Sequence, residues 1–125
     1  MFSLLGSGFY LTMDFQRSDR VADLLREILA DLLRREIRDP RVQTVNLTEV
    51  KVTKDLRHAT IFFSVLGDSV GKSEAWAGLK SASGFIRSKV AKQLNLRFVP
   101  SIEFTYDETE EEARRIESLL RVAKS

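Results

Sequence analysis

Residues 73–95 have the sequence SEAWAGLKSASGFIRSKVAKQLN, which combines helical spacing with an interruption. The spacing predicts helix, with Ser73 as its N-cap, because apolar side chains return every three or four residues: Trp76, Leu79, Ile86, Val90 and Leu94. Gly84 closes a stretch of small residues, Ser81-Ala82-Ser83-Gly84, whose two serines and glycine lower its helix propensity. The sequence therefore predicts two helical segments with a bend or break near Gly84.

Three β-strands are predicted around this helical region. Two runs rich in β-branched and aromatic residues, 44–53 and 57–66, are separated by Lys54-Asp55-Leu56, which is short enough for a hairpin. The apolar residues change parity within the first run, which predicts a β-bulge near Thr48-Glu49. The third strand carries its apolar residues in alternation: Ile102, Phe104 and Tyr106.

Two further helices flank these elements. Residues 18–38 place apolar side chains on one helical stripe, with Ser18 as N-cap and the Asp39-Pro40 pair as the stop. A final helix follows the third strand and is capped by Asp107 or Thr109. Its core-facing stripe is predicted to consist of Ala113, Ile116, Leu119, Leu120 and Ala123.

The order of these elements predicts the fold class. A strand hairpin followed by a helical crossover to a third strand implies an α+β fold, with a three-stranded mixed sheet and helices packed on one face. The length of 125 residues fits one domain. Residues 1–12 combine glycines and aromatics without helical periodicity. We expect them to form a disordered N-terminal extension ahead of a single domain over residues 13–125.

The composition excludes several kinds of chemistry. The chain has no cysteine and one histidine, which excludes disulfides, thiolate metal sites and cysteine nucleophiles and makes a transition-metal site implausible. We therefore expect no cofactor and no small-molecule substrate. No apolar run approaches the length of a membrane span, and the N-terminus lacks an export signal. We expect a cytoplasmic protein without membrane contact.

Three local patterns resemble catalytic or ligand motifs only superficially. Gly71-Lys72-Ser73 resembles the end of a phosphate-binding loop, but Leu66 stands where that motif needs a glycine. His58 has no nucleophile motif to serve, which indicates a surface side chain. The acids between positions 107 and 112 are suited to capping a helix, with a magnesium site as the alternative.

The small net charge of +2 hides a strong segregation of charge along the chain. Residues 72–97 contain six basic residues and one acid, a local net charge of +5. Residues 103–112 contain six acids and no base, a local net charge of −6. A basic helical region interrupted at a glycine suits contact with phosphates, because the backbone can approach closely where no side chain intervenes.

The chain from about residue 15 to 122 resembles the ribosome-binding factor A family of bacterial assembly factors. The matching segments are Arg20-Val21-Ala22, Glu36-Ile37-Arg38-Asp39-Pro40-Arg41, Val50-Lys51-Val52-Thr53-Lys54-Asp55-Leu56, Ala82-Ser83-Gly84-Phe85-Ile86-Arg87 and Leu96-Arg97, followed by Pro100, Phe104, Asp107, Arg115-Ile116 and Leu119-Leu120. Ala113-Arg114 departs from the pattern, because family members commonly have a glycine before the Arg-Ile pair.

This resemblance implies a type II KH-like domain in which an A-x-G kink, here Ala82-Ser83-Gly84, replaces the usual G-x-x-G loop. It also implies binding to the free, immature small (30S) ribosomal subunit through its 16S rRNA. The implied role is non-catalytic assistance of late maturation, including processing of the RNA 5′ end, with a link to growth in the cold. We expect a monomer.

The candidate RNA-binding residues are the kink and the basic side chains around it: Lys80, Ala82, Ser83, Gly84, Arg87, Lys89, Lys92 and Arg97, with Arg38 and Arg41 extending the surface. Phe85, Ile86 and Trp76 are predicted to be core residues rather than base-stacking platforms. Two alternatives remain. One is a charged protein-interaction module without RNA contact, and the other is a magnesium-dependent nuclease that uses the acids at positions 107–112.

Overall fold

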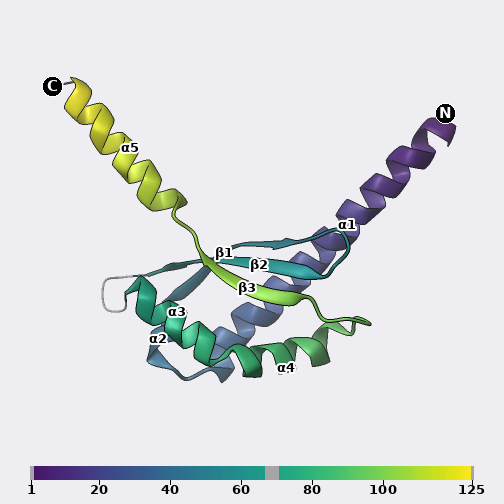
Figure 1. The fold of residues 1–125 in the computed structure, drawn as a ribbon, viewed down its shortest axis with the longest axis horizontal. Coiled ribbons are helices and arrows are strands. Elements are labelled where there is room, and N and C mark those ends of the chain that lie inside the picture. The colour runs from purple at the N-terminus through teal and green to yellow at the C-terminus, as the bar shows by residue number, and fades with distance from the viewer. Residues whose placement is uncertain (1, 67–70, 125) are drawn as a thin grey trace.

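The computed structural model describes residues 2–66 and 71–124, with side chains described for residues 17–66 and 71–123. The elements in chain order are α1 (Phe2–Asp31), the π-helical turn η1 (Leu32–Glu36), α2 (Pro40–Gln43), β1 (Val45–Val52), β2 (His58–Val65), α3 (Lys72–Ser81), α4 (Ser83–Leu94), β3 (Ser101–Tyr106) and α5 (Thr109–Lys124). Figure 1 shows α1, α3 and α4 on one side of the sheet, while α5 and the N-terminal end of α1 extend away from it.

The sheet is mixed, as predicted. Its strand order is β1-β2-β3, with β1 antiparallel and β3 parallel to β2. The register of β1 shifts between Leu47 and Glu49, which confirms the predicted bulge. Because side chains alternate between the two faces of a strand, the extra residue moves Val50 and Val52 to the face that Leu47 already occupies.

The core lies between the sheet and the three helices. Leu25 and Leu29 of α1, Ile61 and Phe63 of β2, and Leu79 of α3 are fully buried. Ile86, Val90 and Leu94 of α4 continue the same cluster. The apolar stripes predicted for residues 18–38 and 73–95 therefore face the sheet, with Trp76 as an exception described below.

The first helix begins earlier than predicted. Residues 2–12 belong to α1, where the sequence predicted a disordered extension. Each residue added to an existing helix gains a hydrogen bond without a new nucleation cost, so a helix can continue through residues of poor propensity until a strong breaker stops it. Ser18 is consequently not an N-cap, since it lies inside the helix and is only 4% exposed. That residues 1–12 lie outside the KH-like domain remains a prediction.

The end of the first helical region contains a short helix that the sequence did not predict. Beyond η1, the carboxylate of Asp39 accepts a hydrogen bond from the Arg41 N–H at 3.0 Å, and Pro40 occupies the first position of α2. The Arg41 guanidinium also donates to this carboxylate, and these hydrogen bonds hold the pKa of Asp39 below its ordinary value. Asp39-Pro40 therefore ends one helical region and caps the next.

Gly78 allows α3 to pack closely on α2. A Cβ atom at this position would lie 2.9 Å from Arg41 Cβ and 2.9 Å from Val42 Cγ1. We expect Gly78→Ala to lower the free energy of unfolding by about 1–3 kcal/mol, because overpacking outweighs the gain in helix propensity. Urea unfolding measures the change. Gly84→Ala is the matched control, and equal stability of the two variants would contradict the close packing.

α5 does not pack on the sheet, so the predicted core-facing stripe is wrong. Asp107 caps the helix, accepting a hydrogen bond from the Thr109 N–H at 3.0 Å. Hydrogen bonds from Thr109 and Thr48 lower the pKa of Asp107. Tyr106 donates to Glu111 at 2.9 Å and Lys72 pairs with Glu108 at 2.8 Å. These contacts hold the first turn in an orientation that carries α5 away from the body (Figure 1), leaving Leu119 63% exposed.

The exposure of α5 leads to a stability prediction. We expect the double substitution Leu119→Ser and Leu120→Ser to leave the thermal midpoint of the domain nearly unchanged, because both side chains are more than half exposed and lie outside the core cluster. Differential scanning calorimetry measures it, with Leu79→Ala as the core control that should lower stability by about 2–5 kcal/mol. A comparable drop in the α5 variant would show that the helix packs on the body in solution.

Candidate nucleic-acid interface

The predicted break between the two crossover helices is present at Ala82. Ala82 is both the C-cap of α3 and the N-cap of α4, with φ −86° and ψ −1°. Its N–H donates to the Gly78 carbonyl at 3.0 Å, and the next bonded amide, that of Ile86, donates to the Ala82 carbonyl at 2.9 Å. Within the described residues, the N–H groups of positions 83–85 have no main-chain acceptor. The break therefore presents three consecutive free amides.

Gly84 lies at the exposed surface of this break. A Cβ atom added there would meet nothing within 4 Å, and the backbone does not adopt a positive φ. The fold itself therefore gives no steric reason for a glycine at this position. Its lack of a side chain leaves the neighbouring amides open to a molecule that approaches from outside.

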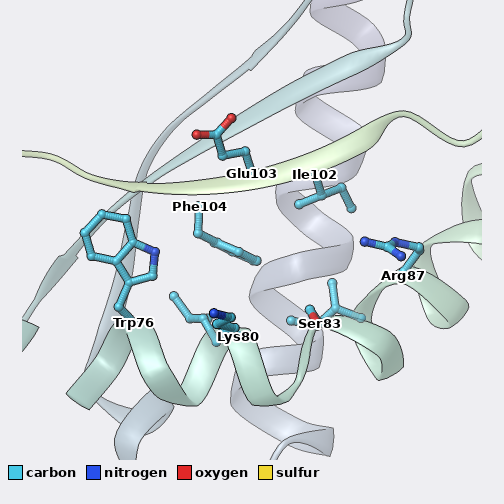
Figure 2. Close-up of a pocket in the computed structure, with 9 residues that line it drawn as sticks. Trp76, Lys80, Ser83, Arg87, Ile102, Glu103 and Phe104 are labelled. Atoms are coloured by element: carbon cyan, nitrogen blue, oxygen red, sulfur yellow. The ribbon is translucent and has the colours of Figure 1, made fainter. Parts of the chain in front are cut away.

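A groove of about 290 Å³ runs beside the break, between β3 and the α3–α4 pair. Trp76 and Lys80 of α3 and Ser83 and Arg87 of α4 line one side, and Ile102 and Phe104 of β3 line the other (Figure 2). Leu79 and Ile86 contribute apolar surface from the core. Glu103 borders the groove, but its carboxylate points to the opposite side of β3 (Figure 2). The result is an apolar groove with cationic side chains at its margin.

Lys80 and Arg87 are brought together by the break. They come from different helices, are exposed, and line the same groove. Lys92 is exposed about one and a half turns beyond Arg87 on α4. In the described part of the chain, none of these three side chains has an acidic partner. Their charge is therefore available to an anionic ligand.

Arg41 and Arg38 lie on the segment that packs beneath α3. Arg41 pairs with Asp39 at 2.6 Å, and its guanidinium reaches the Ser81 hydroxyl at 3.5 Å. The hydrogen bonds with Asp39 raise the pKa of Arg41 and neutralise much of its charge locally. Arg38 is exposed between η1 and α2. The structure thus places Arg41 beside the end of α3, where it helps to hold α2 in position.

Two other predicted basic residues contribute less to this surface. Lys89 is half-buried, pairs with Glu36 at 3.8 Å, and lies 5.5 Å from the centre of the Phe85 ring. Arg97 follows α4, at the end remote from the break, and contacts Phe98. The ten predicted site residues therefore do not form one group. Five lie at the break, Arg41 and Lys89 are paired with carboxylates, and the other three are exposed elsewhere: Lys80, Ala82, Ser83, Gly84 and Arg87 at the break, and Arg38, Lys92 and Arg97 elsewhere.

Two aromatic side chains predicted to be in the core are instead exposed. Ile86 is buried as predicted, but Phe85 is 42% exposed and Trp76 is 41% exposed. The core positions of α4 are Ile86, Val90 and Leu94, and Phe85 lies about 100° from that stripe. Trp76 lies one residue after the buried Ala75, at the margin of the stripe. The spacing of Trp76 and Lys80, four residues apart on one helix, could have indicated their shared face.

A comparison with family models identifies the chain. The model described as Ribosome-binding factor A matches residues 17–120. The chain belongs to the ribosome-binding factor A family. The Geobacter metallireducens ribosome-binding factor A is 45% identical over 107 residues, which cover 86% of this chain and 91% of that protein. The Syntrophobacter fumaroxidans member is 45% identical over 111 residues, which cover 87% and 95% of the two chains.

Solved structures agree with the KH-like fold of the ribosome-binding factor A family. The crystal structure of the Thermus thermophilus factor gives a TM-score of 0.62 at 19% identity, covering 71% of this chain and 94% of that chain. A Thermotoga maritima protein solved by NMR gives a TM-score of 0.55 at 30% identity, covering 75% and 86%. The resemblance and the fold class predicted from the sequence are both confirmed.

The remaining candidate sites have structural explanations in this member of the ribosome-binding factor A family. His58 is exposed, and its Nδ1 lies 2.9 Å from the Ser101 hydroxyl. Glu110 pairs with Arg114 at 3.0 Å, and Lys72 holds the pKa of Glu108 below its ordinary value. Over the described residues, the acids at positions 107–112 do not converge into a metal-binding group. None of the described helices has the length and apolar character of a membrane span.

Proposed function

We propose that this protein is a non-catalytic assembly factor that acts in the cytoplasm on the free, immature small (30S) ribosomal subunit. It binds the 16S rRNA and assists late maturation, including processing of the RNA 5′ end. The observation that carries this proposal is the helix break, where three free amides lie beside Lys80 and Arg87. The names of the curated relatives, which call them ribosome-binding, support the same conclusion.

The chemistry of the break suits the RNA backbone. Free amides at the start of a helix donate hydrogen bonds to phosphate oxygens, and the helix dipole favours an anion there. Gly84 leaves room for that approach, and Lys80 and Arg87 supply counter-charge on either side. The phosphate oxygens that repeat along an RNA chain fit the three adjacent amides and two cations better than a single small anion does.

The acidic segment determines the orientation of binding. Glu110, Glu111 and Glu112 lie in the first turn of α5, which extends away from the body (Figure 1). RNA is repelled from this acidic first turn and attracted to the α3–α4 side, so the bound strand lies along the break. The segregation of charge in the sequence thus becomes a segregation in space.

Sedimentation with ribosomal particles tests the proposal. We expect the protein to travel with free small subunits and not with complete ribosomes, and the bound fraction to fall as salt rises. The slope of log affinity against log salt should be about −0.7 to −0.9 for each phosphate contacted. A salt-independent interaction, or equal binding to both particles, would contradict it. Accumulation of 16S rRNA with an unprocessed 5′ end in depleted cells tests the maturation role.

The exposed stripe on α5 favours a second candidate function, a contact with a protein. Ile116, Leu119 and Leu120 are all more than half exposed on one helix. A pull-down on assembling subunits, comparing the native chain with the Leu119→Ser, Leu120→Ser variant, distinguishes the two. Loss of subunit binding in the α5 variant, with the affinity for naked 16S rRNA unchanged, would indicate a protein partner.

A further inference from the structure

A second pocket, of about 370 Å³, lies where α1, η1, α2 and the first residues of β1 meet. It shares no lining residue with the groove beside the helix break. Leu33, Val42 and Leu47 give it an apolar floor, and all three are almost fully buried. Its charged lining residues are Arg26 and Arg34, and among the described residues no acid lines it. The pocket therefore combines an apolar floor with a cationic rim.

Arg26 is held in place at this pocket by the main chain of β1. Its Nη2 donates a hydrogen bond to the Leu47 carbonyl at 3.1 Å, where the register of β1 shifts at the bulge. In the described part of the chain, no carboxylate pairs with Arg26. Because a guanidinium has five N–H donors, the other donors of Arg26 are available to a ligand.

The π-helical turn brings Arg34 to the same pocket. Arg34 follows Arg26 by eight residues, which in a continuous α-helix would turn it about 80° away from the face of Arg26. η1 instead contains a wider turn, with a hydrogen bond from the Ile37 N–H to the Leu32 carbonyl at 2.9 Å. A wider turn rotates each residue less about the helix axis, so Arg34 turns back toward Arg26. Single π-helical turns are frequent at functional sites.

Ala30 lies between the two arginines, one turn from each, and its small side chain leaves the space between them open. Arg34 is 4.0 Å from Asp31, and its side chain is 72% exposed, so it is free to move onto a ligand. Arg26 is already fixed by its bond to the main chain. Two guanidinium groups on one open space suit a carboxylate, since such charge-assisted hydrogen bonds are strong and directional.

Gln43 adds a hydrogen-bond acceptor to the lining. Its Nε2 donates to the Ile37 carbonyl at 2.6 Å, which fixes the amide, because a carbonyl only accepts. Among the described residues, nothing donates to the Gln43 Oε1. The pocket thus offers donors for an anion, an acceptor and an apolar floor. The last residue of a protein chain matches all three when its side chain is apolar, whereas a phosphate matches only the first.

We propose that this pocket binds the C-terminal residue of a partner protein whose chain ends in an apolar side chain. The terminal carboxylate lies between Arg26 and Arg34, and the main-chain N–H of the same residue donates to Gln43 Oε1. Its side chain contacts Ala30 and Leu33. The volume of about 370 Å³ is near the lower end of the range for ligand pockets, which suits one or two residues. This proposal does not depend on RNA binding at the break.

A short peptide that ends in leucine tests the proposal by fluorescence anisotropy with the full-length protein. The probe is Gly-Gly-Gly-Leu with a dye on its N-terminus. We expect it to bind about tenfold more tightly than the same peptide with a C-terminal amide, which loses the charged hydrogen bonds. We also expect it to bind about tenfold more tightly than Gly-Gly-Gly-Gly, which lacks the apolar side chain. Equal binding in either comparison would overturn the proposal.

Inorganic phosphate tests whether the pocket accepts any anion. Phosphate supplies the charge of a carboxylate but has neither an N–H donor attached to an apolar side chain nor that side chain. We expect unlabelled Gly-Gly-Gly-Leu to displace the labelled peptide and the same concentration of phosphate to displace little of it. Equal displacement by the two competitors would assign the pocket to phosphate and overturn the proposal.

Arg34→Gln and Arg35→Gln form a matched pair of variants. The two neighbouring arginines are 72% and 71% exposed and both pair with Asp31, but only Arg34 lines the pocket. We expect Arg34→Gln to lower the affinity for the labelled peptide about tenfold, and Arg35→Gln to lower it less than about twofold. Equal effects of the two substitutions would show that net charge alone attracts the peptide and would overturn the proposal.

Ala30→Leu tests the space between the arginines without removing a charge. Ala30 is exposed on α1 and leucine has a similar helix propensity, so the thermal midpoint should stay the same by circular dichroism. The larger side chain occupies the space that the carboxylate needs, and we expect the affinity for the labelled peptide to fall about tenfold. Unchanged or tighter binding by the folded variant would overturn the proposal.

Discussion

Gly84→Val is expected to weaken binding to 16S rRNA about tenfold without destabilising the protein. The position has open space around it and an ordinary helical backbone, so the fold tolerates a side chain there. Valine and alanine both have a higher helix propensity than glycine, and the free energy of unfolding should stay the same or rise by up to about 1 kcal/mol. The loss of affinity comes from branched methyl groups that hold a phosphate away from the free amides.

Gly84→Ala makes this expectation more specific. Its single methyl group intrudes less, so we expect a smaller loss of affinity than for valine, with a similar stability. Filter binding to a 16S rRNA fragment and urea unfolding on the same samples separate the two effects. If the valine and alanine variants bind equally well, the backbone at the break does not approach the RNA. If Gly84→Val lowers the free energy of unfolding, the glycine is required for folding stability rather than for RNA binding.

The elements that could be predicted from sequence are those whose signals are local. The bulge at Thr48-Glu49 follows from a change of parity, and the break at Ala82 follows from the serines and the glycine around it, which have low helix propensity. The mixed sheet follows from a hairpin and a helical crossover. Each of these patterns points to one backbone arrangement. The structure confirms the bulge, the break and the mixed sheet.

What could not be predicted depends on long-range packing. The apolar stripe in the sequence of α5 indicates that the helix has an apolar face. It does not indicate whether the domain offers a surface on which that face can pack, and in the structure Leu119 of this face is exposed. Gly78 resembles any other helical glycine in the sequence, and only the approach of α2 gives it a packing role. Trp76 and Phe85 lie at the margins of their stripes, where a shift of one residue decides between core and surface.

Within the candidate site, the structure brings together only some of the residues that the sequence grouped. Lys80 and Arg87 lie together at the groove, but Lys89 is paired with Glu36 and Arg97 lies at the remote end of α4. A count of charges along the chain cannot detect a partner supplied by η1. It also cannot detect the groove, because one wall belongs to β3, and the two walls meet only in the folded chain.

Neutralising both free cations at the groove, with Lys80→Gln and Arg87→Gln, is expected to lower affinity for 16S rRNA between tenfold and a hundredfold at moderate salt. Neither side chain has an ion-pair partner in the described structure, so the double variant should unfold at the same temperature as the native chain. Each lost phosphate contact should reduce the magnitude of the salt slope by about 0.7–0.9. The expected reduction for the pair is therefore about 1.4–1.8.

The matched control carries the same change in net charge on α5, with Arg114→Gln and Arg121→Gln. Both arginines form ion pairs four residues apart on the helix, with Glu110 and Glu117, so their charge is already compensated away from the break. We expect this control to leave the salt slope unchanged and to alter affinity less than threefold. Equal losses in the two double variants would mean that net charge alone governs binding, and would remove the α3–α4 groove from the mechanism. A loss confined to Lys80 and Arg87, with the full change in slope, places two phosphates there and makes the helix break the point where RNA and protein meet.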